Sequence, residues 1–596
     1  MDGLKKGLPS KETFDFGAFA DALNNIPSRF TAEETVIIAL DFGTTFSGIA
    51  YCFPNRQNSK VAAVVNWPGP NGEAHNAPKI PTLLKYNGTK LTWGAAVNPV
   101  ADNIVGVKLL LDPDQETPHY LPTTNARREI GKLPKKPVQL AADFIRAMYD
   151  HALQQISNEV TEAYMKLCQK QYVLSVPARW SDAAKNATLQ AARIAGLHPV
   201  TLIKEPEAAA LHTLKDLSFS LKKEDAFVVC DAGGGTVDLI AYEVEDLNPQ
   251  LRVKELVPGT MGMAGSLGLN KRFEEAVKDL IGDEELFRIK KVNEGKSWFR
   301  AITQFDREVK PAFRGQLSEE YFINFPMADL DDDPDRGLES NCWRMTGDDL
   351  KKIFAPLITD ILRLINDQVN EVKIRRPQKG ITGIFLVGGF GSSVYLKSCV
   401  QKAQPGIQVL QPSDAWSAIA KGAVLAKLPN SAVVSSTKAT QHYGVESMDA
   451  WSPVLDYGEQ TVMHPDGVLC VSAFQWYINV DDDLELDQVV RFPYYRTLLD
   501  GFTDDELIFV DELFECRDKT APRHRSKSET VKRNCSVRSD LRGVDRTKFR
   551  RKNALDGNAY YEVDYELVVK LESALMTFSC EVGGKTLASV EASYRD

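Results

Sequence analysis

Two short segments rich in glycine and threonine constrain this chain most, because each follows a short apolar run and begins with an aspartate. Residues 36–40 (VIIAL) lead into DFGTT at 41–45, and residues 226–230 (AFVVC) lead into DAGGGTVD at 231–238. Short, β-branched apolar runs predict buried strands. The two aspartates lie 190 residues apart, which is a domain-sized interval. We therefore expect two related half-domains, each with a strand that ends at a polar loop.

The composition of these loops suits phosphate. Glycine lets backbone N–H groups approach an anion closely, and successive N–H groups form a concave anion site. Asp41 and Asp231 cannot bind phosphate directly, because like charges repel, but an aspartate can hold Mg²⁺ through water. One such loop is usually only a turn, whereas two with Asp, Gly and Thr in the same order predict a clamp for a nucleoside triphosphate.

Length and composition limit the remaining possibilities. A chain of 596 residues is too long to fold around a single hydrophobic core, so two to four domains are expected. No apolar run is long enough to span a membrane. The nine cysteines are scattered without a CxxC pair, which argues against a zinc site and favours a reducing compartment, so we expect a cytoplasmic protein.

Periodicity predicts an α/β region followed by a β-rich one. Strands are expected at 46–53, 61–67, 172–176, 239–244 and 384–387, and helices at 137–158, 267–281, 292–309, 346–372 and 413–426. The predicted organisation is a tail at 1–33, a two-lobed nucleotide-binding domain at 34–430, a linker at 431–439 and a β-rich domain at 440–596.

Residues 517–552 hold fourteen Lys or Arg against four Asp or Glu, in a chain of net charge −10. A basic stretch can mark a nucleic-acid or anionic-lipid site, but Phe549 is its only aromatic residue, which weakens a reading as a site for single-stranded nucleic acid. We interpret it as a long solvated loop within the β-rich domain, and we expect no nucleic-acid partner.

Five motifs occur in the order found in the ATPase domain of the heat shock protein 70 family, which belongs to the actin/hexokinase-like (ribonuclease H-like) superfamily. They are DFGTTFS at 41–47, VPA at 176–178, EPEAAA at 205–210, DAGGGTVD at 231–238 and LVGGFG at 386–391. The chain resembles this family over about residues 34–430, and within it the divergent branch that lacks the helical lid. The resemblance implies a duplicated ATPase domain that binds ATP or ADP with Mg²⁺.

The resemblance also implies roles for individual residues. Asp41, Glu205 and Asp231 would hold Mg²⁺, mostly through water, with Asp238 near the attacking water and Lys108 reaching the γ-phosphate. The residues implied to line the nucleotide are Gly43, Thr44, Thr45, Gly233, Gly234, Gly235, Thr236, Gly388, Gly389, Phe390 and Gly391.

Three segments depart from the family pattern. Phe390 and Ser392 replace residues that usually meet the adenine, and Phe390 could equally stack on a base or pack in the core. The acidic-then-leucine linker is reduced to Val433-Val434, and no long helical lid follows residue 440. Arg307 or Lys310 would take the place of the basic residues that grip the adenine from the other lobe.

The favoured function is a slow Mg²⁺-dependent ATPase. Its ATP cycle would control how the β-rich domain binds an unfolded or extended polypeptide. Cochaperones would be further partners. Two alternatives remain open. A small-molecule kinase of the same superfamily would need an extra carboxylate base, and a nucleotide-gated scaffold would bind ATP with negligible turnover.

Overall fold

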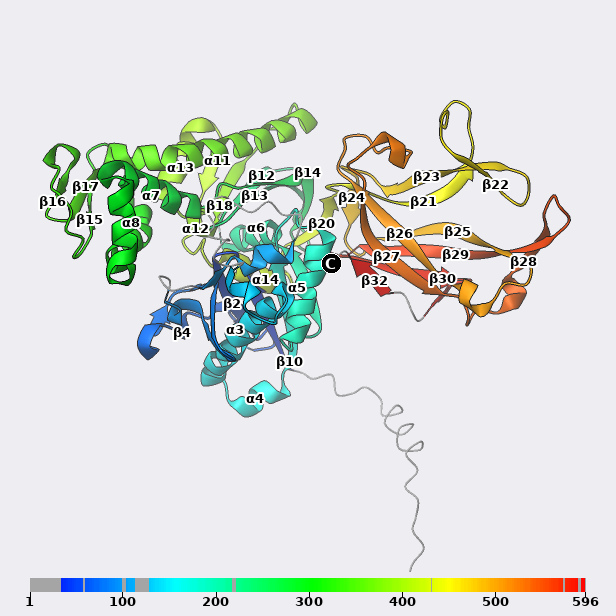
Figure 1. Cartoon of the computed structure of the whole chain (residues 1–596), viewed down its shortest axis with the longest axis horizontal. Helices are drawn as coiled ribbons and strands as arrows, with labels where there is room; N and C mark the ends of the chain where they lie inside the picture. The colour runs from blue at the N-terminus through cyan, green and yellow to red at the C-terminus, as the bar shows by residue number, and fades with distance from the viewer. Residues whose placement is uncertain are drawn as a thin grey trace, which may run out of the picture.

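The computed structural model describes residues 34–56, 59–98, 103–112, 128–216, 221–429, 431–571, 574–587 and 591–594. The predicted tail, residues 1–33, lies outside the described residues. Figure 1 shows a larger part that contains the helices and, beside it, a strand-rich part formed by the C-terminal quarter of the chain. None of the described helices is long and apolar enough to cross a membrane.

The first sheet is built around β1 (Thr35–Asp41) in the order β11-β10-β1-β2-β3, with β6 paired to β2. β1 runs parallel to β10 and antiparallel to β2. The partners are β2 (Phe46–Cys52), β3 (Ala62–Ala63), β6 (Ile80–Pro81), β10 (Gln169–Val176) and β11 (Val200–Lys204). Small strands flank this sheet: β4 (Asn66–Pro68), β5 (Ala74–Asn76), β7 (Leu83–Asn87), β8 (Lys90–Trp93) and β9 (Ile104–Val105).

Side chains of β1 alternate between two helical layers. Ile38 and Leu40 share a core with α3 (Pro137–Glu159) and α5 (Asp182–Ile194). Ile37 and Ala39 share a different core with α6 (Glu205–Asp216) and α14 (Ala418–Leu425). Successive strand residues face opposite sides, so a sheet covered on both faces has an unbroken apolar run. This is why residues 36–40 show no polar alternation.

The second sheet has the order β19-β18-β12-β13-β14-β20-β24. Its strands are β12 (Ala226–Ala232), β13 (Val237–Asp246), β14 (Arg252–Gly262), β18 (Gly383–Val387), β19 (Gln408–Leu410), β20 (Val433–Lys438) and β24 (Asp483–Glu485). Phe227 and Val229 on β12 join the core of α6 and α14, so these two helices lie between the sheets. They cross closely, since a Cβ on Gly422 would lie 1.7 Å from the Ala208 carbonyl oxygen.

The opposite face of β12 packs on an outer group of helices. Val228 and Cys230 share a core with α7 (Leu267–Ile281) and α11 (Gly347–Arg375). A capping box starts α11, because Thr346 and Asp349 exchange hydrogen bonds. The group is completed by α8 (Asp283–Lys291), α9 (Lys296–Gln304), α13 (Val394–Ala403) and the small sheet of β15 (Glu320–Asn324), β16 (Leu338–Glu339) and β17 (Cys342–Thr346).

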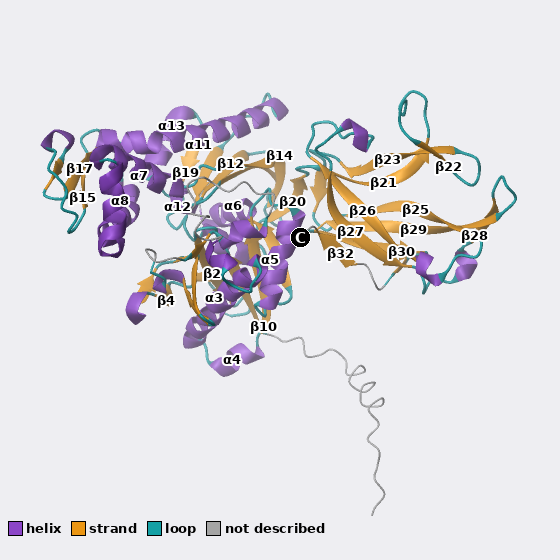
Figure 2. Cartoon of the chain, viewed as in Figure 1, coloured by secondary structure: helices purple, strands orange, loops and turns teal. Residues whose placement is uncertain are grey.

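From residue 440 onward the described elements are strands and short 3₁₀ turns (Figure 2). One sheet has the order β22-β23-β21-β26-β27-β32, and the other β25-β29-β30-β31 with β28 beside β29. The strands are β21 (His442–Ala450), β22 (Thr461–Met463), β23 (Leu469–Ile478), β25 (Val489–Leu499), β26 (Ile508–Cys516), β27 (Lys532–Asp540), β28 (Arg550–Asn553), β29 (Ala559–Leu571), β30 (Met576–Val582), β31 (Lys585–Thr586) and β32 (Glu591–Tyr594). Both sheets contribute to two shared cores.

Several predicted elements need correction. The expected strand at 61–67 is split between β3 and β4, which belong to different sheets. The expected helix at 292–309 is interrupted by a 3₁₀ turn at Val292–Gly295 and a π turn at Phe305–Val309. The helix expected at 413–426 begins only at Ala418. The predicted linker at 431–439 contains β20, which pairs with β14 and β24.

The basic stretch 517–552 is not one long loop, because it contains β27 and most of β28. Its cations pair with acids on neighbouring strands and loops. These pairs include Arg525–Glu446, Arg533–Glu512 and Lys552–Glu562, at 3.0, 3.2 and 2.8 Å. The local positive excess is thus partly neutralised inside the folded domain.

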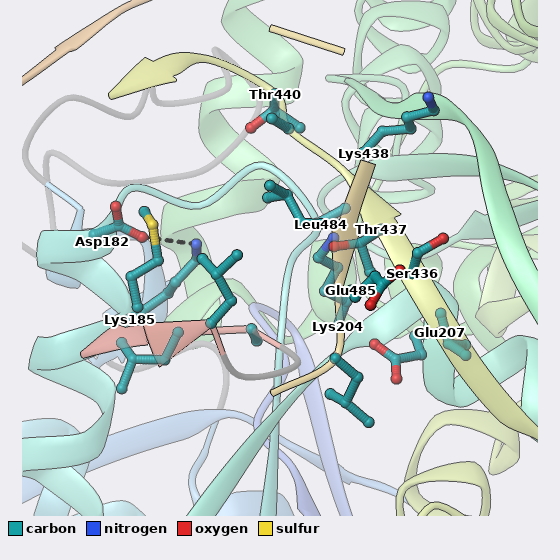
Figure 3. Close-up of a pocket in the computed structure, with 18 of the residues that line it drawn as sticks. Asp182, Lys185, Lys204, Glu207, Ser436, Thr437, Lys438, Thr440, Leu484 and Glu485 are labelled. Carbon is teal, nitrogen blue, oxygen red and sulfur yellow. Dashed lines mark hydrogen bonds and ion pairs between the residues drawn. The ribbon is translucent and has the colours of Figure 1, made fainter. Parts of the chain in front are cut away.

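The strand-rich part contacts the first lobe through a buried carboxylate, Asp182 at the start of α5. It accepts hydrogen bonds from the Tyr443 hydroxyl at 3.0 Å and Asn534 Nδ2 at 2.9 Å, and it pairs with Lys185 at 2.9 Å. Burial alone would raise the pKa of Asp182, but Lys185, Asn534 and Tyr443 outweigh it and lower that pKa. Asp182 and Lys185 border a cavity of about 70 Å³ that β20 also lines (Figure 3).

We expect Asp182→Ala to loosen this contact, because it leaves the buried Tyr443 hydroxyl and the half-buried Lys185 ammonium without this acceptor, at a cost of about 1–3 kcal/mol. Limited proteolysis of the 426–441 segment should become faster. Glu162→Ala removes an exposed ion pair on the same lobe and should leave the cleavage rate unchanged. Equal cleavage of both variants would contradict the assignment.

Candidate nucleotide site

The first loop lies between β1 and β2 and is fixed by hydrogen bonds. Gly43 N–H donates to Ser47 Oγ at 3.1 Å, and Thr82 Oγ1 donates to the Gly43 carbonyl at 2.9 Å. A Cβ on Gly43 would lie 2.0 Å from the Phe46 carbonyl oxygen, so only glycine allows this turn. The loop therefore holds its polar groups at the edge of the sheet, where β1 ends.

The second loop faces the first. A Cβ on Gly234 would lie 2.1 Å from Thr45 Oγ1, and one on Gly235 would lie 3.3 Å from the Thr44 side chain. Gly265 braces the second loop from behind, because a Cβ there would lie 2.3 Å from the Gly234 carbonyl oxygen. The structure thus brings both predicted loops to one place, with glycines of the second loop against threonine side chains of the first.

The third predicted segment, at 388–391, approaches the second loop. Gly388 has φ +83°, and a Cβ there would lie 2.3 Å from Asp231 Oδ1. Phe390 is buried in the core of the outer helices, where its ring meets Phe354 edge-on at 6.2 Å. Of the two expectations for Phe390, this geometry favours core packing over stacking on a base.

The three segments line one cleft of about 1620 Å³. Most of the predicted residues border it: Asp41, Gly43, Thr44, Thr45, Lys108, Glu205, Asp231, Gly233, Gly234, Gly235, Thr236, Gly388, Gly389 and Phe390. Arg307 and Lys310 also line it, and Lys310 pairs with Asp306 and donates to Asn270 Oδ1 at 3.1 Å. Gly391 packs against Leu386 and Ala232, behind the lining.

Two buried ion pairs lie within the cleft. Lys108 Nζ is 2.5 Å from Glu205 Oε1 and 5.3 Å from the centre of the Trp180 ring. Lys79 Nζ is 2.5 Å from Asp41 Oδ2. The sequence reasoning missed Lys79, which belongs to none of the five motifs and reaches the site only through the pairing of β6 with β2. It also missed Trp180 and Trp416, which line the cleft.

Glu205 and Asp231, which line the cleft, and Asp238, which lies behind the lining, shift one another's pKa values. Burial, followed by repulsion from Glu205, raises the pKa of Asp231 well above its usual value and the pKa of Asp238 to about 7. Burial likewise raises the pKa of Glu205, even though Lys108 opposes the shift. Asp231 and Asp238 are paired residues on β12 and β13, so the ladder itself keeps their charges close.

A cation suits this arrangement. Asp231 Oδ1 and Asp238 Oδ1 are buried, and neither has a hydrogen-bond partner in the described part of the chain. Within the same described ranges, no three His, Cys, Asp or Glu side chains lie close enough to ligate one ion directly. The residues therefore fit a metal held largely through water, which Mg²⁺ prefers because it sheds water reluctantly.

The raised pKa of Asp238 predicts how the stability of the metal-free protein depends on pH. A carboxyl that titrates near 3.8 unfolded and about 7 folded destabilises the native state progressively as pH rises from about 4 to 7. We expect Asp238→Asn to make this pH dependence shallower, because Asp231 and Glu205 still contribute to it, and to raise the free energy of unfolding at pH 8 by about 1–3 kcal/mol. Thermal melts in EDTA over a range of pH measure this dependence. Asp335→Asn, which alters an exposed carboxylate, is the control and should give the wild-type profile. Identical profiles for wild type and Asp238→Asn would contradict the assignment.

The sequence of this chain is similar to those of known proteins. The family model for Hsp70 proteins matches residues 122–440. Human heat shock 70 kDa protein 12B is 25% identical over 557 residues, covering 78% of each chain. Human heat shock 70 kDa protein 12A is 24% identical over 564 residues, covering 79% of this chain and 81% of that protein. The chaperone protein DnaK of Deinococcus radiodurans is 28% identical over 226 residues, covering 35% of this chain and 32% of its own.

The family match covers more than half of the chain and contains the second glycine-rich loop at 231–238, Glu205 and the 388–391 segment. The expected resemblance is confirmed, and the chain belongs to the Hsp70 family as a divergent member.

Proposed function

We propose that this protein binds ATP or ADP with Mg²⁺ in the cleft and hydrolyses ATP slowly, using two duplicated half-domains of the actin/hexokinase-like kind. The observation that carries the proposal is the contact of the two glycine loops, with Gly234 against Thr45. Each loop ends a central strand of its sheet, so backbone N–H groups from both lobes converge on one volume. Phosphate groups are the ligands that such paired anion-binding loops suit.

Hydrolysis of ATP requires the protein mainly to position the phosphates and water and to neutralise charge. Mg²⁺, when bound, neutralises phosphate charge and orients oxygens. Asp41, Glu205 and Asp231 would hold it through water, and Asp238 would accept a hydrogen bond from the attacking water. Lys108, now paired with Glu205, has the reach and the charge to meet the terminal phosphate. Gly389 lies beside Trp416 Nε1, in the segment we assign to the adenosine side.

Calorimetric titration of the purified protein with Mg·ATP and Mg·ADP tests binding itself. Saturable binding with a stoichiometry of one is expected. No binding of either nucleotide would remove the proposal, whatever the behaviour of the C-terminal strands.

We further propose that the strand-rich part, residues 440–596, binds unfolded or extended polypeptide and that cochaperones act on the cycle. The relatives HscA homolog and DnaK carry the name chaperone protein. The segment between β21 and β22 exposes Val454, Leu455 and Tyr457, at 85%, 61% and 84% of their surface. Exposed apolar side chains grouped on one loop suit an apolar partner. β20 and Asp182 join this part to the two lobes, so closure of the lobes can change its affinity.

A cytoplasmic location fits this function. All nine cysteines are unpaired in the structure, which suits a reducing compartment.

Asp231→Asn should lower single-turnover hydrolysis of ATP by about a hundredfold or more, because it removes preorganised charge from the metal and water site. The circular dichroism spectrum and thermal melt should stay those of a folded protein. Unchanged hydrolysis would exclude Asp231 from the reaction. Wild-type binding with negligible turnover would favour the nucleotide-gated scaffold, and turnover that rises steeply with one metabolite would favour the kinase.

Leu455→Ser combined with Tyr457→Ser should weaken binding of an extended apolar peptide by about tenfold or more, since each buried apolar side chain contributes about 1–2 kcal/mol. Fluorescence anisotropy with a labelled peptide measures the change. Val65→Ser, which alters an equally apolar exposed residue on the first lobe, is the matched control. Equal affinity of the double variant and the control would rule out this loop as the peptide site.

A further inference from the structure

Asp41 already has partners on both carboxylate oxygens. Ser175 Oγ donates to Asp41 Oδ1 at 3.0 Å, and Lys79 Nζ lies 2.5 Å from Asp41 Oδ2. All three side chains are buried. Any cation that Asp41 holds must therefore share the carboxylate with an ammonium group that the protein itself supplies.

The backbone that carries Lys79 is tied to the first phosphate loop. Thr82 N–H donates to the Thr45 carbonyl at 2.8 Å, and the Thr82 hydroxyl donates to the Gly43 carbonyl at 2.9 Å. β6, which begins directly after Lys79, pairs antiparallel with β2 through Phe46 and Ser47. The ammonium group is thus positioned by the same residues that shape the loop.

Gly48 leaves room for the side chain of Lys79. Gly48 on β2 lies opposite Asp41 in the β1–β2 ladder. A Cβ on Gly48 would lie 3.1 Å from Lys79 Cγ and 2.9 Å from the Pro78 carbonyl oxygen. The aliphatic stem of Lys79 crosses the strand at this bare position, and its ammonium reaches the end of β1 where the phosphate loop begins.

Carboxylates dominate the surroundings of Lys79. Asp41 is its direct ion-pair partner, and Asp231 and Glu205 are the next negative charges near it. Lys108 balances Glu205 in the same cleft. The two buried ammonium groups of the cleft, on Lys79 and Lys108, are thus each paired to a carboxylate, Asp41 and Glu205, from a different segment.

We propose that Lys79 is a further positioning residue of the nucleotide site, a built-in cation beside Asp41 that makes nucleotide binding less dependent on divalent metal. The inference rests on the proposed function, because it takes the cleft to bind ATP. When ATP binds, its phosphates add negative charge beside the carboxylates of the cleft. Lys79 neutralises part of this negative charge, so the metal ion has less negative charge to neutralise. A purely structural ion pair would not be linked to metal in this way.

The measurement is the Kd of ATP in excess EDTA divided by its Kd in Mg²⁺, taken by calorimetry on the full chain. Lys79→Met should raise this ratio by about tenfold or more relative to wild type, mainly through weaker binding in EDTA. Lys79→Arg keeps the charge and should change the ratio by less than about threefold. The exposed Lys90→Met, on the same lobe, should leave it at the wild-type value.

A ratio for Lys79→Met that equals wild type, or Kd values that rise equally with and without Mg²⁺, would overturn the proposal. Undetectable wild-type binding in EDTA would overturn it as well. Absence of wild-type binding even in Mg²⁺ is a different result, since it removes the proposed function itself. If Lys79→Met does not fold, Gly48→Ala serves instead, because its methyl group displaces the lysine stem while the charge remains, and the ratio should again rise.

Discussion

The close approach of the Gly234 backbone to the Thr45 side chain is the constraint on which the rest of this structure depends. Two loops can meet at that distance only if the sheets behind them are held in a fixed relation. α6 and α14 provide that relation, because they fill the space between the sheets and cross at Gly422, where the backbones nearly touch. Close packing of this kind leaves little slack, so small shifts between the lobes must appear at the loops.

Much of this architecture could be predicted because its determinants are local in sequence. An apolar run long enough for one strand, followed by aspartate and glycine, predicts a buried strand with a polar end, and β1 and β12 follow that rule. The helices α3, α7 and α11 were predicted from their apolar spacing, and their observed bounds agree within a few residues. Most residues assigned to the site from the five motifs line one cleft.

The features that could not be predicted depend on pairing between distant segments. Lys79 resembles any surface lysine until β6 pairs with β2 and Gly48 opens its path to Asp41. The basic stretch has the composition of a loop, yet cross-strand acids such as Glu512 and Glu562 let its cations lie on strands. Phe390 was ambiguous because stacking and burial both select an aromatic ring, and only the position of Phe354 distinguishes them.

β20 has a consequence for the exposed edges of the second sheet. It covers β14, whose outer N–H and C=O groups would otherwise be unpaired along Arg252–Lys254. An uncovered strand edge is a template for other extended chains, including those of misfolded proteins. If β20 left this position, the edge of β14 would be exposed and could pair with another extended chain. The short pairing of β14 with β20 therefore also acts as a guard against self-association.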